Sequence, residues 1–181
     1  MERKRPTKED LVRAIHKKVP DVISNNLKVL FVGINPGLYT AAIGHHFGRP
    51  GNRFWPALYS AGFTKRLLSP YEESELLKVN IGITNLAARA TNTAAEVSVT
   101  ELKEGVKILE EKIKKYHPEW VVILGVQSYR QAFDRPKAQI GLQEEKIAQA
   151  KVWLLPNPSG LNAHFSPNTL TKLFKELKST I

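Results

Sequence analysis

The residues best suited to chemistry lie in one stretch, VLFVGINPGLYTAAIGHHFGRPGNRFW, which runs from Val29 to Trp55. A short apolar run ends in the turn Asn35-Pro-Gly, and two adjacent histidines, two arginines and several aromatic residues follow it. The stretch contains no aspartate or glutamate. A reaction at this loop must therefore use neutral amides, backbone groups and aromatic rings in place of an acid.

Several common chemistries are excluded by what the chain lacks. Without cysteine, it offers no disulfide, thiolate zinc site, iron–sulfur cluster or thiol nucleophile. The turn GINPGL fails the G-x-G-x-x-G spacing of a dinucleotide site, and no P-loop or G-x-S-x-G elbow is present. The side chains of His45 and His46 point apart on most backbones, so a shared metal is not expected. We expect neither a metal nor a cofactor.

An asparagine can still support one kind of hydrolysis. Its side chain cannot take up a proton, but its amide oxygen can accept a hydrogen bond from a water and aim that water. This is sufficient only when the leaving group departs almost unaided. Uracil on deoxyribose is such a case, because the departing ring holds negative charge that backbone N–H groups stabilise in a dry pocket. The alternative is that Asn-Pro-Gly merely turns the chain after a strand.

Length and charge favour one domain that binds a polyanion. The 181 residues are enough for a single core, and we divide them into a basic N-terminal extension with a short helix, residues 1–25, and one domain, residues 26–181. The net charge of +10 favours nucleic acid, with a solubilising surface as the alternative. If the cations of the acid-free segments converge, they form one face that does not repel phosphate; these segments are residues 22–71, 76–95 and 146–175.

Four apolar runs alternate with helical patterns along the chain. The runs predict buried strands at residues 28–34, 79–86, 119–125 and 151–156. Capping residues predict helix starts at Ser69, Ser98 and Ser166. This alternation predicts an α/β fold with a mostly parallel sheet. Ligands bind at the carboxyl ends of such strands, where the loops GINPG, GITNLAARAT and LLPNPSGLNAHFS lie.

Two long motifs carry a resemblance to a known family. GINPGLYTAAIGHHFGRPGNRFW together with LPNPSGLNAHFS resembles the mismatch-specific uracil-DNA glycosylases and their relatives, the thymine-DNA glycosylases. The segments GFTKRLLSP, GITNLAARAT and WVVILGVQSYRQAF between them are also similar, so the resemblance runs from about Val29 to Leu177. It implies a three-layer α/β/α sandwich with a central, mostly parallel four-stranded sheet.

The resemblance implies roles for residues of the first motif. Asn35 matches the residue that positions the attacking water, and Phe47 matches the one that stacks on the extruded base, although an aromatic beside glycines is more often part of a core. Ile34 and Phe47 would offer backbone groups to the pyrimidine edge. His46 would contact the base or a phosphate, with a plain surface histidine as the alternative.

Further residues complete the implied site. Asn85 matches a pocket position that would read the Watson–Crick face of a pyrimidine, with a strand-end cap as the alternative. Thr40 falls on a small-residue position that would help decide whether the 5-methyl group of thymine is tolerated.

The second motif implies a wedge loop. Leu161 would enter the base stack and offset part of the few kcal/mol of unstacking. The alternative is that Leu161 is a buried loop anchor. Gly160 and Asn162 would face the partner base, and Asn157 and Ser159 belong to the same loop. Relatives often carry serine at the position of Asn162, which leaves partner-base preference open.

The sequence therefore predicts a monofunctional DNA glycosylase for base excision repair, which flips and excises uracil or a related pyrimidine mispaired with guanine. A DNA module that recognises damage without excising it is the alternative, and an α/β nucleotide-binding protein is a weaker one.

We expect a monomer whose partner is double-stranded DNA with G·U or G·T mismatches. No apolar run predicts a membrane span or a secretory leader. Such a role implies the nucleoid-associated cytoplasm in a bacterium and the nucleus in a eukaryote.

Overall fold

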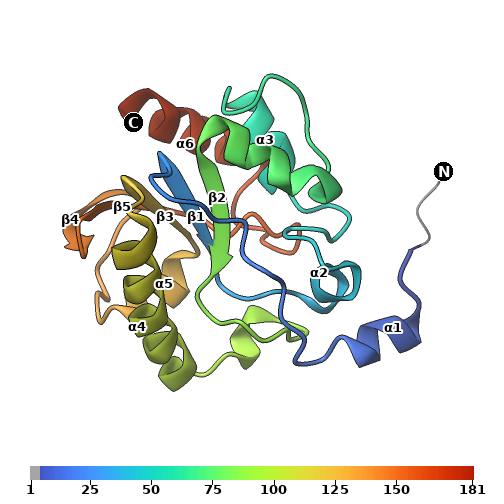
Figure 1. Ribbon diagram of the computed structural model, residues 1–181. Coiled ribbons are helices and arrows are strands. Elements are labelled where there is room, and N and C mark those ends of the chain that lie inside the picture. Colours follow the sequence, from blue (N-terminus) through green and yellow to red (C-terminus); the bar gives the residue numbers. More distant parts are fainter. Residues whose placement is uncertain (1–4) are drawn as a thin grey trace.

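Five strands form the central sheet in a computed structural model, which describes residues 5–181 (Figure 1). The strand order is β2-β1-β3-β5-β4, with the first four parallel and β4 antiparallel to β5. The α/β prediction is confirmed, but the prediction of four strands missed β4, because that edge strand, GLQEEKI, has no apolar run. The bounds are β1 Val29–Gly33, β2 Ile81–Asn85, β3 Trp120–Leu124, β4 Gly141–Ile147 and β5 Ala150–Leu155.

Helices cover both faces of the sheet and complete the three layers (Figure 1). Helices α3 and α6 pack together on one face, and α4 and α5 pack together on the other. Two short helices, α1 and α2, contact each other away from the sheet. The helical bounds are α1 Lys8–Arg13, α2 Leu38–Ile43, α3 Phe54–Ser60, α4 Val99–Tyr116, α5 Val126–Ala132 and α6 Pro167–Thr180, with 3-10 helices η1 Pro70–Val79 and η2 Ala94–Glu96.

The helix starts predicted from capping residues are present. Ser98 Oγ accepts from the Glu101 backbone N–H at 3.1 Å, and the Glu101 carboxylate accepts from the Ser98 N–H at 3.1 Å, which closes a reciprocal cap at the start of α4. Ser166 caps α6 in front of Pro167. Ser69 begins η1, which is a 3-10 helix.

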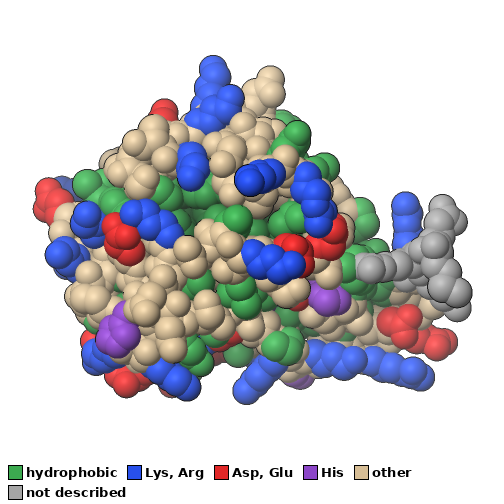
Figure 2. Space-filling model, turned by 45° about the horizontal axis from the view of Figure 1, so that its top comes forward, with side chains coloured by type: hydrophobic (Ala, Val, Ile, Leu, Met, Phe, Trp, Pro, Cys, Tyr) green, Lys and Arg blue, Asp and Glu red, His purple; other side chains and the backbone are tan. Residues whose placement is uncertain are grey.

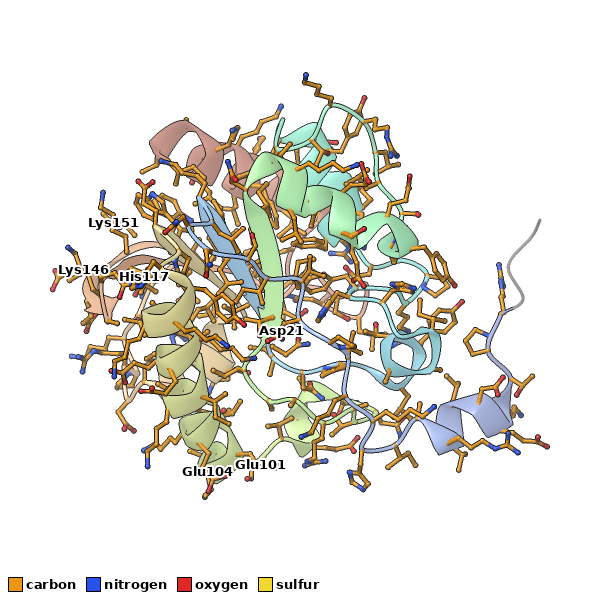
Figure 3. The ribbon with its side chains drawn as sticks, in the orientation of Figure 1. Asp21, Glu101, Glu104, His117, Lys146 and Lys151 are labelled. Atoms are coloured by element: carbon orange, nitrogen blue, oxygen red, sulfur yellow. The ribbon has the colours of Figure 1, made fainter. Side chains whose placement is uncertain are left out.

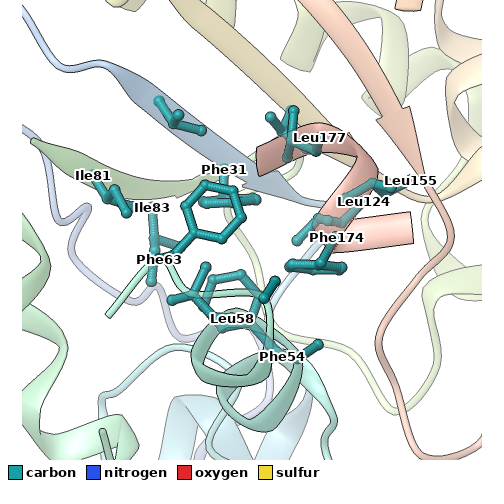
Figure 4. Packing of buried hydrophobic residues seen from close by; sticks show 14 of the residues in the cluster. Phe31, Phe54, Leu58, Phe63, Ile81, Ile83, Leu124, Leu155, Phe174 and Leu177 are labelled. Carbon is teal, nitrogen blue, oxygen red and sulfur yellow. The ribbon is translucent and has the colours of Figure 1, made fainter. Parts of the chain in front are cut away.

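The core is divided by the sheet, because successive strand residues face opposite sides. In β1, Phe31 belongs to the cluster under α3 and α6, and Leu30 and Val32 belong to the cluster under α4 and α5. The Phe31 ring contacts Phe54 of α3 edge-on, with ring centres 5.3 Å apart, and stacks on Phe174 of α6 at 5.9 Å (Figure 4). This packing holds the carboxyl end of β1, where Asn35 follows, against both helices.

The segment before β1 is also bound to the sheet. Val22 pairs with Ile83 of β2 through backbone hydrogen bonds in both directions, at 2.9 and 2.8 Å. Ala14 is buried beside Ala41 and Ala90. The division of the chain at residue 25 stays a prediction, but His16, Lys17 and Pro20 form hydrogen bonds with the loops at the carboxyl ends of the strands. None of the helices within residues 5–181 combines the length and apolar character needed to cross a membrane.

Candidate active site

The three loops predicted to gather at the carboxyl ends of the strands enclose one pocket of about 430 Å³. No aspartate, glutamate or lysine is among the lining residues in the described part of the chain. Gly160 is the one predicted site residue outside the lining. The predicted residues that line the pocket are Ile34, Asn35, Thr40, His46, Phe47, Asn85, Asn157, Ser159, Leu161 and Asn162.

Asn35 is held by its amide nitrogen. Nδ2 donates to Thr91 Oγ1 at 2.6 Å and lies 3.1 and 3.3 Å from the backbone oxygens of Pro36 and Arg89. The two backbone oxygens can only accept hydrogen bonds. Thr91 Oγ1 must also accept from Nδ2, because it donates its own hydrogen to the Thr93 carbonyl at 2.7 Å. The amide oxygen is therefore left as the acceptor that a water in the pocket would meet.

Thr91 is a residue that sequence reasoning missed. The residue is 3% exposed, and it lies at the end of GITNLAARAT, a loop that the sequence marked without singling out this position. The Thr91 backbone N–H also donates to the Pro36 carbonyl at 3.2 Å, so the loops after β1 and β2 are joined beside Asn35. The signal available in the sequence was the run of three polar residues, Thr91-Asn-Thr, after the second strand.

Phe47 presents a ring that is supported from behind. The ring stacks on Phe54 with centres 4.0 Å apart and planes at 23°. The backbone of Phe47 is left-handed, with φ 51°, a conformation that bulky residues adopt rarely. A Cβ added at Gly33 would come within 2.5 Å of Asn85 Oδ1, so glycine there leaves room for that amide at the floor beside Phe47.

His46 and Asn85 meet at the back of the pocket. His46 is 1% exposed, so the alternative of a surface histidine is wrong. Its Nε2 lies 2.9 Å from the Pro20 carbonyl and its Nδ1 lies 3.4 Å from Asn85 Nδ2. Burial lowers the pKa of His46 below its ordinary 6.5, against the opposing effect of the Glu73 carboxylate. The ring is therefore neutral near pH 7.

Glu73 is a buried carboxylate behind the histidine pair, and it does not line the pocket. Its Oε1 lies 2.8 Å from His45 Nδ1, and its Oε2 accepts from the His46 backbone N–H at 2.7 Å. Both carboxylate oxygens are thus engaged with the loop. We assign Glu73 the task of holding the His45–Phe47 turn in place.

The predicted wedge loop is tied to the first motif by Arg53. The Arg53 guanidinium donates to the carbonyls of Asn162 at 3.2 Å, Gly160 at 3.3 Å and Phe165, and its backbone N–H donates to the Pro158 carbonyl at 2.9 Å. Gly160 lies so close to the other loop that an added Cβ would be 2.6 Å from the Gly51 carbonyl oxygen.

The tip of the same loop points into solvent. Leu161 is 65% exposed, so the alternative of a buried anchor is wrong. Asn157 Oδ1 accepts from the Ser159 backbone N–H at 2.9 Å, and Asn162 Nδ2 donates to the Asn157 carbonyl at 3.1 Å. These bonds give the loop a defined shape that projects an apolar side chain beside the pocket.

Comparison with known proteins identifies the family. The family model described as Uracil DNA glycosylase superfamily matches residues 20–178. The chain belongs to the uracil DNA glycosylase superfamily. This membership makes the protein a DNA glycosylase, a hydrolase of N-glycosidic bonds in DNA. In fold, the glycosylase is similar to a candidate uracil DNA glycosylase from Methanosarcina acetivorans, solved by NMR, with a TM-score of 0.58, 19% identity, and coverage of 91% of this chain and 99% of the other.

Some cations of the acid-free segments are paired with acids and are not free to meet phosphate. Figure 2 shows lysine and arginine side chains with acidic side chains among them. Four cations of the acid-free segments pair with carboxylates from outside those segments, which the linear sequence could not reveal. These pairs are Lys28–Glu119, Arg66–Glu72, Lys78–Glu75 and Arg89–Glu101. Arg49, at the pocket rim, is exposed and remains suited to a phosphate contact.

Proposed function

We propose that the protein is a monofunctional, mismatch-specific DNA glycosylase that flips uracil, or a related pyrimidine mispaired with guanine, out of duplex DNA. The observation that carries this proposal is the orientation of Asn35, whose amide nitrogen is bound by Thr91 and two carbonyls while its oxygen remains for a water. The absence of carboxylates from the described pocket lining supports a reaction that needs an uncharged guide.

In the proposed reaction, a water held by the Asn35 oxygen attacks C1′ of the sugar. The C1′–N1 bond breaks, the electron pair leaves with the base, and the water oxygen forms the new bond to C1′. The water gives up one proton and the departing base takes one up, so the products are an abasic site and free uracil. No lysine lines the described pocket, which supports hydrolysis over a Schiff base and strand cleavage.

The flipped base would be held by an aromatic face and an amide. Phe47, backed by Phe54, supplies a flat surface for stacking, and Asn85 supplies hydrogen-bonding groups at the pyrimidine edge. Leu161 projects beside the pocket, where it would fill the gap left in the stack. The proposed substrate is therefore double-stranded DNA with G·U or G·T mismatches. A protein with this role would act in the nucleoid-associated cytoplasm of a bacterium or in the nucleus of a eukaryote.

Excision from a G·U duplex tests the proposal. Wild-type protein should release free uracil and leave alkali-labile strands, and Asn35→Ala should slow single-turnover excision about 100- to 1,000-fold, the usual cost of removing one preorganised polar group. Binding should be retained by the variant. A wild-type protein that binds the mismatch and never releases base would instead support a lesion-binding module.

A further inference from the structure

We propose that His46 is a positioning residue that fixes which atoms the Asn85 amide shows to the pocket, and that it thereby makes the pocket select pyrimidines with a hydrogen on N3 and an oxygen on C4. The inference rests on the proposed function, since it concerns the base that the same pocket holds. His46 acts through Asn85 and need not touch the base.

The anchor of this arrangement is the Pro20 carbonyl, which belongs to the segment before β1. Its neighbour Asp21 accepts from Thr84 Oγ1 at 2.6 Å and pairs with Lys112 of α4 at 2.5 Å. Figure 3 shows Asp21 beside the carboxyl end of β2. Val22 is paired with Ile83 on the other side of Asp21. The Pro20 carbonyl is therefore an acceptor in a fixed place.

A carbonyl oxygen can only accept, so the His46 nitrogen that faces Pro20, Nε2 at 2.9 Å, must carry a hydrogen. In the neutral ring the other nitrogen, Nδ1, is then an acceptor. Asn85 must turn its NH₂ group toward Nδ1, and its Nδ2 does lie there, at 3.4 Å. The amide orientation thus follows from the chemistry of the Pro20 carbonyl.

The neutral state of the ring is part of this argument. The charged and titratable groups around His46 are Glu73, Asp21 and His45; the two carboxylates favour protonation and His45 opposes it. Burial has the largest effect and lowers the pKa of His46. Near pH 7 the ring therefore keeps Nδ1 unprotonated and available to Asn85.

The consequence for the pocket is an exposed amide oxygen. Asn85 Oδ1 lies against the floor at Gly33, where an added Cβ would be only 2.5 Å away, and it accepts no hydrogen bond from residues 5–181. Within that part of the chain, Trp153 Nε1 is the sole side-chain polar atom that is both fully buried and without a partner. Because Asn85 Oδ1 has no partner there either, it cannot be fully buried, and it remains open to the pocket. Oδ1 suits the N3–H of uracil, and the second N–H of Nδ2 suits its O4. Cytosine presents a bare N3, which this oxygen repels.

The test compares binding of uracil and cytosine in the same duplex. Each base is carried on an uncleavable 2′-fluoroarabinose and placed opposite an abasic-site analogue, so that pairing with a partner base does not contribute. Wild-type protein should bind the uracil duplex more tightly. His46→Gln keeps an amide that can reach the Pro20 carbonyl but removes the Nδ1 acceptor, and it should reduce the uracil-to-cytosine ratio of affinities about 10-fold, the effect of one neutral hydrogen bond.

Three further variants make the result specific. His46→Phe removes both ring nitrogens and should lower the ratio as His46→Gln does, which covers the case that either variant fails to fold. His45→Gln changes the neighbouring ring, which contacts Glu73, and should leave the ratio unchanged. In an Asn85→Ala background, His46→Gln should cause no further change.

Two results would overturn the inference: no preference for uracil in the wild-type protein, or a ratio in His46→Gln and His46→Phe within about twofold of the wild type. Excision of uracil from a G·U duplex by wild-type protein is measured in parallel. If uracil is released but the ratio does not move, the inference about His46 fails and the proposed function stands. If no base is released, the proposed function fails.

Discussion

The amide nitrogen of Asn35 and the hydroxyl of Thr91 are joined by a hydrogen bond of 2.6 Å, and the hydroxyl passes its own hydrogen to the Thr93 carbonyl at 2.7 Å. Asn35 follows β1 and Thr91 lies in the loop after β2, so the bond connects two loops 56 residues apart in sequence. In this series of hydrogen bonds, Asn35 donates to Thr91 and Thr91 donates to Thr93. The direction of these bonds leaves the amide oxygen of Asn35 as its free atom.

Replacing Thr91 with valine should therefore slow excision without removing the guide itself. Thr91→Val keeps the shape and loses the acceptor, so the Asn35 amide can rotate and aim water less often. We expect single-turnover excision of uracil to fall about 3- to 10-fold, the equivalent of one neutral hydrogen bond. Thr91→Ser retains the hydroxyl and should stay close to the wild type. Equal rates in all three proteins would show that Thr91 does not orient Asn35.

Sequence patterns were sufficient for the frame of the site. Strand β1 is apolar throughout, so its buried position and the loop that follows it could be predicted from types and spacing alone. The same holds for α4, where the Ser98–Glu101 cap and the buried stripe agree with the pattern. Strand β4 could not be found in this way, since one side of it is exposed and its residues are mostly polar.

Contacts between distant segments were beyond sequence reasoning. His46 could be placed in a pocket by resemblance, but the hydrogen bond between its ring and the Pro20 carbonyl, 26 residues earlier, could not be foreseen. Arg53 lies in an acid-free segment, whose cations the sequence suggests for phosphate, whereas its guanidinium faces carbonyls of the wedge loop more than 100 residues later. A charge pattern records neither partner, because the partners are backbone atoms that every residue carries.

Thr40 allows the tolerance for thymine to be tested. Its side chain is buried at the pocket, and its Oγ1 accepts from the Gly48 backbone N–H at 3.1 Å. Thr40→Ser removes only the methyl group and keeps this bond, which leaves more room at the base. We expect excision from G·T relative to G·U to rise about 5-fold or more, since one methyl-sized space in an apolar pocket changes discrimination by about 1–3 kcal/mol.

The matched control is Thr40→Val, which keeps a branched side chain and loses the hydroxyl. It should leave the thymine-to-uracil ratio near that of the wild type, although loss of the Gly48 bond should lower both rates. Single-turnover rates on G·U and G·T duplexes supply the ratio. If Thr40→Ser and the wild type show the same ratio, the methyl group of Thr40 does not limit entry of thymine.

Arg53 and Arg49 should differ in the salt dependence of DNA binding. Arg53 is occupied by wedge-loop carbonyls, and Arg49 is exposed at the rim. Arg49→Ala should reduce the slope of log affinity against log salt by about 1, as expected for one lost phosphate contact. Arg53→Ala should weaken duplex binding with little change in slope, because it loosens the loop that carries Leu161.

Arg53→Lys sharpens this comparison. Lysine keeps the charge but cannot reproduce the planar fork that reaches several carbonyls, so it should behave like Arg53→Ala in duplex binding. Titrations at four or more salt concentrations give the slopes. A reduced slope for Arg53→Ala, with recovery in Arg53→Lys, would mean that Arg53 contacts phosphate after all.

The buried ring of His46 should also make the stability of the fold depend on pH. Burial lowers the pKa of His46 in the folded protein below 6.5, so under acid conditions the unfolded chain binds a proton that the folded chain does not. The contribution of this residue to stability is therefore complete above about pH 6.5, and it is lost progressively as the pH falls toward the lowered pKa, by at most about 1.4 kcal/mol per pH unit. Urea unfolding between pH 7.5 and 5.5 should give a steeper loss in the wild type than in His46→Gln, which has nothing to titrate there. Parallel curves for the two proteins would mean that His46 binds its proton equally well in both states, and the neutral ring on which the orientation of Asn85 depends would then lose its support.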